Sequence, residues 1–257
     1  MRMLVIGGCH TYGYGVRPGQ SFVEQFGRRL EQIGAYVEID YYTPFDLPVA
    51  ASLVRNLNLD QYDLILLQLG NYRLQHPSAF KTLLKNRMQT AGPKPDPIKW
   101  TTPVRIVTLR SQSQAPFPTG PNTLGKRLKT GIKIMALKAL DMTRNVERLN
   151  EVGQQLSNVM HALHAHRRKV VLLTPFPHLD PVTYWLRQRG RQLFCQIGRQ
   201  KGVSVLDTHL YIRAQKQYFI TGDSGHLNAI GHELIGLYLY DFYQTRLQQC
   251  AVEETLT

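Results

Sequence analysis

The chain has 257 residues, 43% of them hydrophobic, which is enough to build one domain with a full core. None of its apolar runs approaches the ~18 residues of a membrane-spanning helix, and its three cysteines have neither disulfide-framework nor zinc-site spacing. The formal net charge of +13 is strongly basic, yet no nucleic-acid-binding motif accompanies it. The composition therefore favours a globular protein over a membrane-spanning or nucleic-acid-binding one.

Apolar runs that alternate with helical stripes predict an α/β fold. The runs expected to form strands are short, and they span residues 4–6, 36–42, 63–69, 169–174 and 203–206. The segments between them predict helices over residues 22–33, 48–57, 145–165, 182–200 and 227–248. We therefore expect a single α/β domain over residues 1–257, a three-layer α/β/α sandwich with a central parallel sheet of about five strands.

The first predicted strand ends at a thiol. Two glycines, Gly7 and Gly8, follow the apolar run and permit a tight turn with close approach of the backbone. Cys9 comes next, at the edge of the sheet where ligands bind in open α/β folds. A thiol in that place can act as a nucleophile, although a small buried core residue is the alternative interpretation.

A second cluster of polar residues stands near the other end of the chain. It lies in the glycine-rich loop before the last predicted helix, and it contains Asp223 and, three residues later, His226. A histidine and a carboxylate at this spacing suit a general base and the group that orients its ring. The pair could therefore activate a nucleophile that the fold brings to it.

The two clusters resemble the first and last motifs of the SGNH (GDSL-type) hydrolases. The family's first motif is Gly-Asp-Ser followed by Tyr-Gly, and this chain has Gly7-Gly8-Cys9-His10-Thr11-Tyr12-Gly13. The family's last motif is Asp-x-x-His-x-Asn-x-x-Gly-His, and this chain matches it with Asp223, His226, Asn228, Gly231 and His232. The resemblance implies an SGNH/flavodoxin-like sandwich and a catalytic triad of Cys9, His226 and Asp223.

The chain departs from the family's motifs at three places. Cys9 replaces the nucleophilic serine, and Gly8 replaces the aspartate before it. The loop after the second strand lacks the family's oxyanion-hole glycine, so a backbone N–H would come from Thr43, Phe45 or Asp46. The third motif, Gly-x-Asn-Asp in the family, is Gly70-Asn71-Tyr72-Arg73 here. The resemblance therefore implies an oxyanion site formed by the Cys9 N–H and Asn71, with Tyr72 as an alternative donor.

Residues 73–143 fit the α/β pattern least well, and we interpret them as an inserted cap or lid. They contain eight prolines and 13 Lys or Arg residues against two acids, which is +11 of the chain's formal charge. A long basic insertion after the Gly70-Asn71 turn would lie at the mouth of the proposed site. It could meet an acidic carrier protein or an anionic surface, and residues 126–140 could form a basic amphipathic helix, although a solvated surface loop is the alternative.

Two further expectations concern the remaining histidines and metals. We expect the ring of His10 to point away from the Cys9 side chain, with a role in tuning the thiol or touching substrate as the alternative. A metal held by Cys9, His226 and Asp223 would need a ligand geometry that the local spacing does not support, so we expect neither a metal nor another cofactor.

The sequence predicts an enzyme that acts on an ester or thioester through a covalent acyl-cysteine, either as a hydrolase or as an acyltransferase. Residues Met1-Arg2-Met3 lead directly into the first strand and leave no room for a signal peptide, which predicts a cytoplasmic location and a reduced thiol. The rival hypothesis is a binding protein for an acidic ligand on a catalytically impaired esterase scaffold. Retention of Asp223 and His226 argues against that rival.

Overall fold

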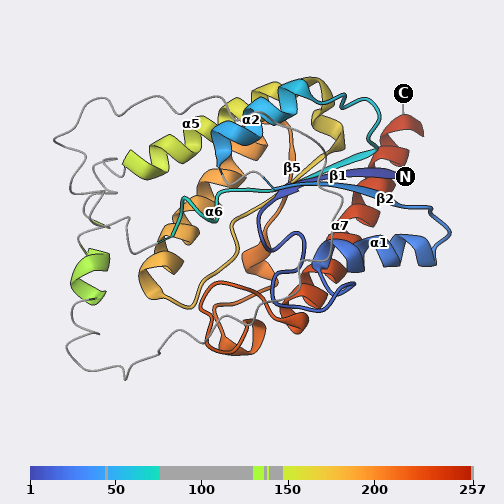
Figure 1. Cartoon of the computed structure of the whole chain (residues 1–257). Helices are drawn as coiled ribbons and strands as arrows, with labels where there is room; N and C mark the ends of the chain where they lie inside the picture. The colour runs from blue at the N-terminus through green and yellow to red at the C-terminus, as the bar shows by residue number, and fades with distance from the viewer. Residues whose placement is uncertain (44–45, 76–129, 136–137, 139–146, 256–257) are drawn as a thin grey trace.

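The computed structural model describes residues 1–43, 46–75, 130–135, 138 and 147–255 (Figure 1). Five strands form one sheet in the order β2-β1-β3-β4-β5, and every neighbouring pair is parallel. The strands are β1 (Arg2–Gly7), β2 (Glu38–Tyr42), β3 (Leu64–Gln68), β4 (Val170–Leu173) and β5 (Ser204–Leu206). The predicted parallel sheet of five strands is confirmed.

Helices cover both faces of the sheet, which confirms the three-layer sandwich (Figure 1). Helices α1 (Phe22–Gln32) and α7 (Ala229–Thr255) pack against each other on one face. Helices α2 (Leu47–Asn56), α5 (Glu147–Ala162) and α6 (Pro181–Lys201) cover the other face. Each face therefore has its own hydrophobic core, and the sheet separates the two.

Strand β1 shows why the central strands are apolar along their whole length. Leu4 and Ile6 point into the core under α2, α5 and α6, whereas Met3 and Val5 point into the core under α1 and α7. Successive side chains of a strand face opposite sides, so a strand covered on both sides has to be apolar at every position. The apolar runs that predicted the strands are the consequence of this double burial.

Most helix boundaries differ from the sequence prediction by one or two residues, and the last helix extends to Thr255 rather than to residue 248. Two boundaries are explained by local structure. The helix expected over residues 145–165 ends at Ala162, and a short 3-10 helix, His164–Lys169, leads from there into β4. The last helix begins at Ala229 rather than at residue 227, because Leu227 forms an isolated antiparallel bridge with Phe219. The side chain of Asn228 then accepts a hydrogen bond from the Gly231 N–H at 3.0 Å, as a helix-capping residue does.

Most of the predicted insertion lies outside the described residues, so its role as a cap stays a prediction. Of the proposed helix over residues 126–140, the structure describes residues 130–135, which are helical, and residue 138. Ile132 and Met135 are exposed there, so these apolar side chains of the proposed helix do not pack in a core. No helix in the described part of the chain has the length and apolar character needed to span a bilayer.

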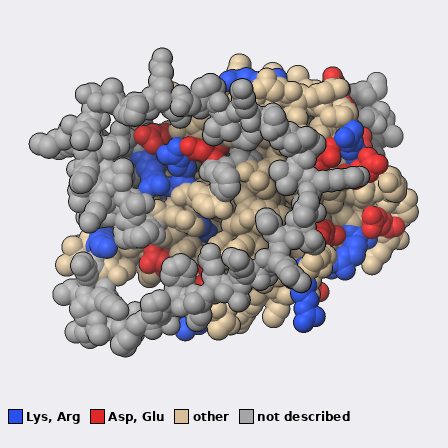
Figure 2. Space-filling model, viewed as in Figure 1, with Lys and Arg blue, Asp and Glu red and all other residues tan. Residues whose placement is uncertain are grey.

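The charge of the chain is concentrated in residues 73–143, because the rest carries only +2 of the formal +13. Figure 2 shows the basic and acidic side chains of the described residues mixed with one another on the face in view. On that face the described surface is of mixed charge rather than continuously basic.

A comparison of two glycine variants tests whether close packing against Phe194 fixes the turn after β3. Gly70 and Gly34 both have a positive φ, +85° and +89°. A Cβ at Gly70 would lie 2.8 Å from the Phe194 ring, whereas a Cβ at Gly34 would have no described atom within 4 Å. Both Gly→Ala variants adopt a left-handed conformation, which costs about 1 kcal/mol, but only Gly70→Ala also overpacks a buried ring, at about 2 kcal/mol more. Urea denaturation should show this difference; equal losses would mean that Phe194 moves freely.

Candidate active site

Three loops at the carboxyl edge of the sheet line a cleft that is open to solvent, and the start of α2 borders it. The first follows β1 and presents Cys9, and the second follows β3 and presents Asn71 and Tyr72. The third, which precedes α7, presents Gly225 and His226. Because all strands are parallel, their carboxyl ends share one edge, which is where ligands bind in such sheets.

The turn at Gly8 delivers the thiol into this cleft. The Gly8 carbonyl oxygen accepts hydrogen bonds from the Thr11 backbone N–H at 3.0 Å and from the Thr11 hydroxyl at 2.7 Å. A Cβ at Gly8 would lie 2.8 Å from the ring of Tyr72. Glycine is therefore needed here so that the Tyr72 ring can lie against the backbone beside Cys9.

Cys9, His226 and Asp223 lie in a line of hydrogen bonds. The Cys9 Sγ is 3.1 Å from Nε2 of His226, and Nδ1 of His226 is 2.6 Å from Oδ2 of Asp223. Oδ1 of Asp223 accepts hydrogen bonds from the backbone N–H groups of Gly225 and His226. The structure thus brings together the three residues proposed from opposite ends of the sequence, in the order thiol, imidazole and carboxylate.

The ionised forms of Cys9, His226 and Asp223 stabilise one another. Burial acts to raise the pKa of Cys9, but the hydrogen bond and the charge of His226 outweigh it and the net pKa is lowered. Burial acts to lower the pKa of His226, but the contacts with Asp223 and Cys9 raise it to about 9. Asp223 is held ionised, since its hydrogen bonds with His226 and Gly225 outweigh burial and depress its pKa strongly. The arrangement favours a thiolate beside an imidazolium.

Tyr72 contacts the thiol from the cleft side. Its hydroxyl donates to Cys9 Sγ at 3.4 Å, and 40% of the residue is exposed. Burial and the nearby Cys9 charge raise the pKa of Tyr72 far above neutral pH, so the phenol stays protonated. Tyr72, predicted as an alternative oxyanion donor, therefore donates to the sulfur in the unliganded protein.

Asn71 lines the same cleft as Cys9 and is fixed by one hydrogen bond. Its Oδ1 accepts a hydrogen bond from the Phe176 backbone N–H at 3.1 Å. Because an N–H can only donate, this bond fixes which end of the amide is oxygen. The Nδ2 is buried with no partner among the described residues, so it is available to an acceptor in the cleft.

The ring of His10 packs beside the hydrogen-bonded line. It stacks on the ring of His226, with ring centroids 5.3 Å apart, and it also packs on Phe176. Only 3% of His10 is exposed, and burial lowers its pKa well below the usual range. The neutral ring of His10 therefore packs against the imidazole of His226. Because His10 is almost fully buried, a substrate could contact little of it.

Asp46 and Gly70 have structural roles beside the cleft. The Asp46 side chain caps the first turn of α2 through the Leu47 N–H, and it forms a two-pronged ion pair with Arg73. It therefore holds the start of the insertion against α2. Gly70 permits the left-handed turn that aims Asn71 at the cleft. Neither Asp46 nor Gly70 belongs to the hydrogen-bonded line of Cys9, His226 and Asp223.

The sequence analysis missed Gln68 and Arg187, which also line the cleft. Arg187 is completely buried on α6, among positions 183, 186, 190 and 194, which form the buried face of that helix. An arginine at a position of the buried stripe is the signal that could have marked it. Within the described ranges, no group of three or more His, Cys, Asp or Glu residues could hold a metal ion.

No family model and no curated protein sequence matches the chain. Solved structures do match its fold over almost the whole length. A family 3 carbohydrate esterase from Clostridium thermocellum has 16% sequence identity and a TM-score of 0.56, covering 98% of each chain. The protein TesA has 11% identity and a TM-score of 0.56, covering 96% of this chain and 99% of its own.

A protein of the G-D-S-L family from Desulfitobacterium hafniense has 11% identity and a TM-score of 0.54, covering 94% of this chain and 98% of its own. Identities this low establish the fold and leave the chemistry to the residues of the cleft. The resemblance to SGNH hydrolases is thus confirmed at the level of the fold: the chain is an α/β/α sandwich of the type found in SGNH (GDSL-type) esterases.

Proposed function

We propose that the protein cleaves esters or thioesters through an acyl-cysteine intermediate formed on Cys9. The observation that supports this most strongly is the continuous pair of contacts from Cys9 Sγ through His226 to Asp223, 3.1 Å and 2.6 Å long. A buried structural cysteine needs no such partners, and a thiol is activated when a histidine takes up its proton. The esterase fold of the similar structures agrees with this chemistry.

The reaction begins with attack of the Cys9 sulfur on the acyl carbonyl carbon. The proton of the thiol resides on Nε2 of His226, and Asp223 holds the ring with Nδ1 toward itself. When the tetrahedral intermediate collapses, the bond from carbon to the leaving oxygen or sulfur breaks and His226 donates its proton to that atom. Water, or an amine, thiol or alcohol acceptor, then attacks the thioester, with His226 as the base, and regenerates the thiol.

The charge that develops on the carbonyl oxygen is met by Asn71. Its unpartnered Nδ2 lies in the same cleft as Cys9, and the backbone N–H of Cys9 is the second donor that the turn can supply. Donors of this kind, fixed before the reaction, typically contribute about 10²–10³ in kcat each. The bond from Phe176 to Oδ1 fixes the orientation of the Asn71 amide.

The lowered pKa of Cys9 predicts that its thiol is alkylated before that of Cys195. Burial raises the pKa of Cys195, so the thiolate of Cys195 is scarce at neutral pH, whereas His226 favours the thiolate of Cys9. With limiting iodoacetamide, mass spectrometry should find Cys9 labelled first. The rate at Cys9 should rise with pH through a midpoint below that of an ordinary thiol.

His226→Ala should slow the labelling of Cys9 and move its midpoint upward without unfolding the protein. The control is Cys195, whose labelling should not change in that variant. Equal labelling of both thiols in the folded wild-type protein would contradict the activation of Cys9 and favour the rival hypothesis of a binding protein.

A screen of short-chain aryl esters and acyl thioesters should reveal turnover that depends on Cys9. Cys9→Ala should abolish it, and His226→Ala should lower kcat by about 10³ or more, since a nucleophile and its base act as a unit. The pH profile should fall as the pH rises through the His226 pKa of about 9, because the leaving group then loses its proton donor. Turnover that survives in Cys9→Ala would contradict the proposed nucleophile.

The basic insertion is proposed to attract an anionic partner to the cleft. Its +11 charge acts over about 10 Å at 0.1 M salt, so it would affect association more than chemistry. Reversing the charges of Lys126, Arg127 and Lys129 should therefore slow acyl transfer from an acidic carrier protein and leave turnover of a small neutral ester intact. Stopped-flow rates at several salt concentrations test this; equal losses on both substrates would contradict a steering role.

A further inference from the structure

Arg187 places a buried positive charge in the cleft that the proposed reaction does not use. The residue has 0% exposure, on the face of α6 that packs beneath the cleft, and it lines the cleft together with Cys9 and Asn71. Its Nη1 donates to the backbone carbonyl oxygens of Phe176, at 3.0 Å, and Pro177, at 3.2 Å. One nitrogen of the guanidinium is therefore fixed by the backbone.

The other two nitrogens of Arg187 have no partner in the described part of the chain. Both Nε and Nη2 are buried, and no described acceptor lies within hydrogen-bond distance of either. When Nη1 is the nitrogen on the Cδ side, the N–H groups of Nε and Nη2 point in parallel along one edge of the planar group. Such an edge matches the two oxygens of one carboxylate.

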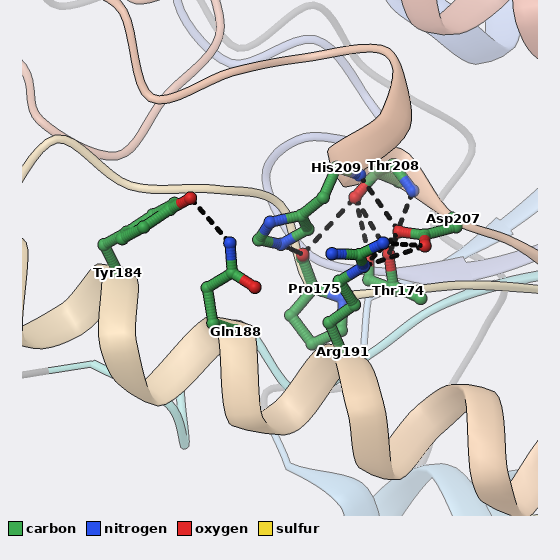
Figure 3. A network of polar contacts seen from close by, with 8 residues as sticks. All are labelled: Thr174, Pro175, Tyr184, Gln188, Arg191, Asp207, Thr208 and His209. Carbon is green, nitrogen blue, oxygen red and sulfur yellow. Dashed lines mark hydrogen bonds and ion pairs between the residues drawn. The ribbon is translucent and has the colours of Figure 1, made fainter. Parts of the chain in front are cut away.

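Two other arginines show what this edge binds in the same protein. One helical turn beyond Arg187 on α6, Arg191 directs Nε and Nη2 to the carboxylate of Asp207, at 2.8 Å and 2.6 Å (Figure 3). Arg73 uses the same two nitrogens on Asp46. Arg187 presents the same edge, but no described carboxylate occupies it.

Arg187 and the proposed oxyanion donor Asn71 are linked through the backbone of Phe176. The Asn71 side chain accepts the N–H of Phe176, and Arg187 donates to the carbonyl oxygen of the same residue. Both side chains also line the cleft together with Cys9. A ligand held by Arg187 can therefore extend toward an acyl group on Cys9 within the same cleft.

The guanidinium keeps its charge in this buried position. Burial lowers the pKa of Arg187 to about 10, with the negative charges of Cys9 and Asp223 opposing that change, so the side chain is protonated at neutral pH. A buried charged group whose N–H groups lack acceptors is destabilising. A ligand that supplies the missing acceptors would remove this cost, so the two unpaired nitrogens indicate a ligand site.

The loop that fixes Nη1 is itself held firmly (Figure 3). The Thr208 hydroxyl and backbone bond with Thr174, and His209 Nε2 lies 2.8 Å from the Pro175 carbonyl oxygen. The segment before Phe176 and Pro177 is thus tied to the residues after β5. Arg187 is positioned by a rigid frame rather than by a mobile loop.

We propose that Arg187 is a specificity-determining residue that binds a carboxylate on the acyl part of the substrate through Nε and Nη2. The preferred substrate is then a half-ester or half-thioester of a short dicarboxylic acid, whose carboxylate supplies the acceptors that Nε and Nη2 lack among the described residues. This proposal rests on the proposed acyl transfer, because that reaction places the acyl carbon at Cys9.

A binding measurement tests the proposal without requiring turnover. Isothermal titration calorimetry would compare succinamate, which has one carboxylate and a neutral amide in place of the ester, with butyramide, which has no carboxylate. Two charge-assisted hydrogen bonds predict that the wild-type protein binds succinamate about 30-fold more tightly or better. Arg187→Met should abolish that preference. Arg187→Lys, which keeps the charge but lacks the fork, should retain part of it.

The matched control is Arg189→Met. Arg189 lies on the same helix, donates to Gln192 and is not among the residues that line the cleft, so its variant should keep the preference. The same comparison in turnover uses 4-nitrophenyl hemisuccinate and 4-nitrophenyl butyrate. Arg187→Met should raise KM for the hemisuccinate by about 30-fold and leave the butyrate ester nearly unchanged.

Several results would overturn the proposal. Equal affinity of the wild-type protein for succinamate and butyramide would do so, even if Arg187→Met failed to fold. If Arg187→Met lowers turnover of both esters equally and raises the midpoint of Cys9 alkylation, Arg187 acts only on the thiol or the oxyanion. If succinamate binds through Arg187 but no ester is turned over, the carboxylate site stands and the proposed acyl transfer fails.

Discussion

The contact of Cys9 Sγ with Nε2 of His226 is the interaction on which the site depends, and it joins residues 217 positions apart in the chain. The parallel sheet makes it possible, since it brings the end of β1 and the loop before α7 to one edge. The contact is then fixed from three sides. Asp223 holds Nδ1 of the imidazole, while His10 and Tyr14 pack their rings on it, with Tyr14 at a centroid distance of 4.5 Å. Substitutions behind His226 should therefore affect the thiol almost as much as those that touch it.

The cleft around this contact is rich in unpartnered hydrogen-bond donors. Among the described residues that line it, Gln68 Nε2, Asn71 Nδ2 and two nitrogens of Arg187 are buried without partners. The carboxylate of Asp46, which also borders the cleft, is already occupied by Arg73. Buried donors without acceptors are destabilising in the free protein, so their concentration at one site indicates a ligand that supplies acceptor oxygens. An acyl oxyanion would accept a hydrogen bond from Asn71 Nδ2, and a carboxylate would accept from the two nitrogens of Arg187.

The sequence was sufficient to predict the fold and the three residues at the centre of the site. The central strands were visible because double burial makes them apolar, whereas the edge strand β2 is only partly buried. The candidate triad was visible because Asp223 and His226 keep a fixed local spacing and because the two end motifs resemble those of one family. Arg187 and the stacking of His10 were not predicted, since their roles arise from contacts between segments distant in sequence. The side chain of Asp46 was given no role, because its pairing with Arg73 depends on how the loops after β2 and β3 approach one another. Only Arg187 had a periodic signal, its place in the buried stripe of α6, and that signal marks the residue without indicating its contacts.

The central claim is that Cys9 becomes acylated during the reaction. The most direct test mixes the protein with a reactive aryl or thioester acyl donor, quenches with acid within the first turnover and maps the modified peptide by mass spectrometry. The account predicts the added acyl mass on the peptide that contains Cys9, sensitive to hydroxylamine as a thioester is, and longer-lived in His226→Ala once formed. Acylation of a serine, or turnover with no acyl group at Cys9 at any quench time, would contradict it.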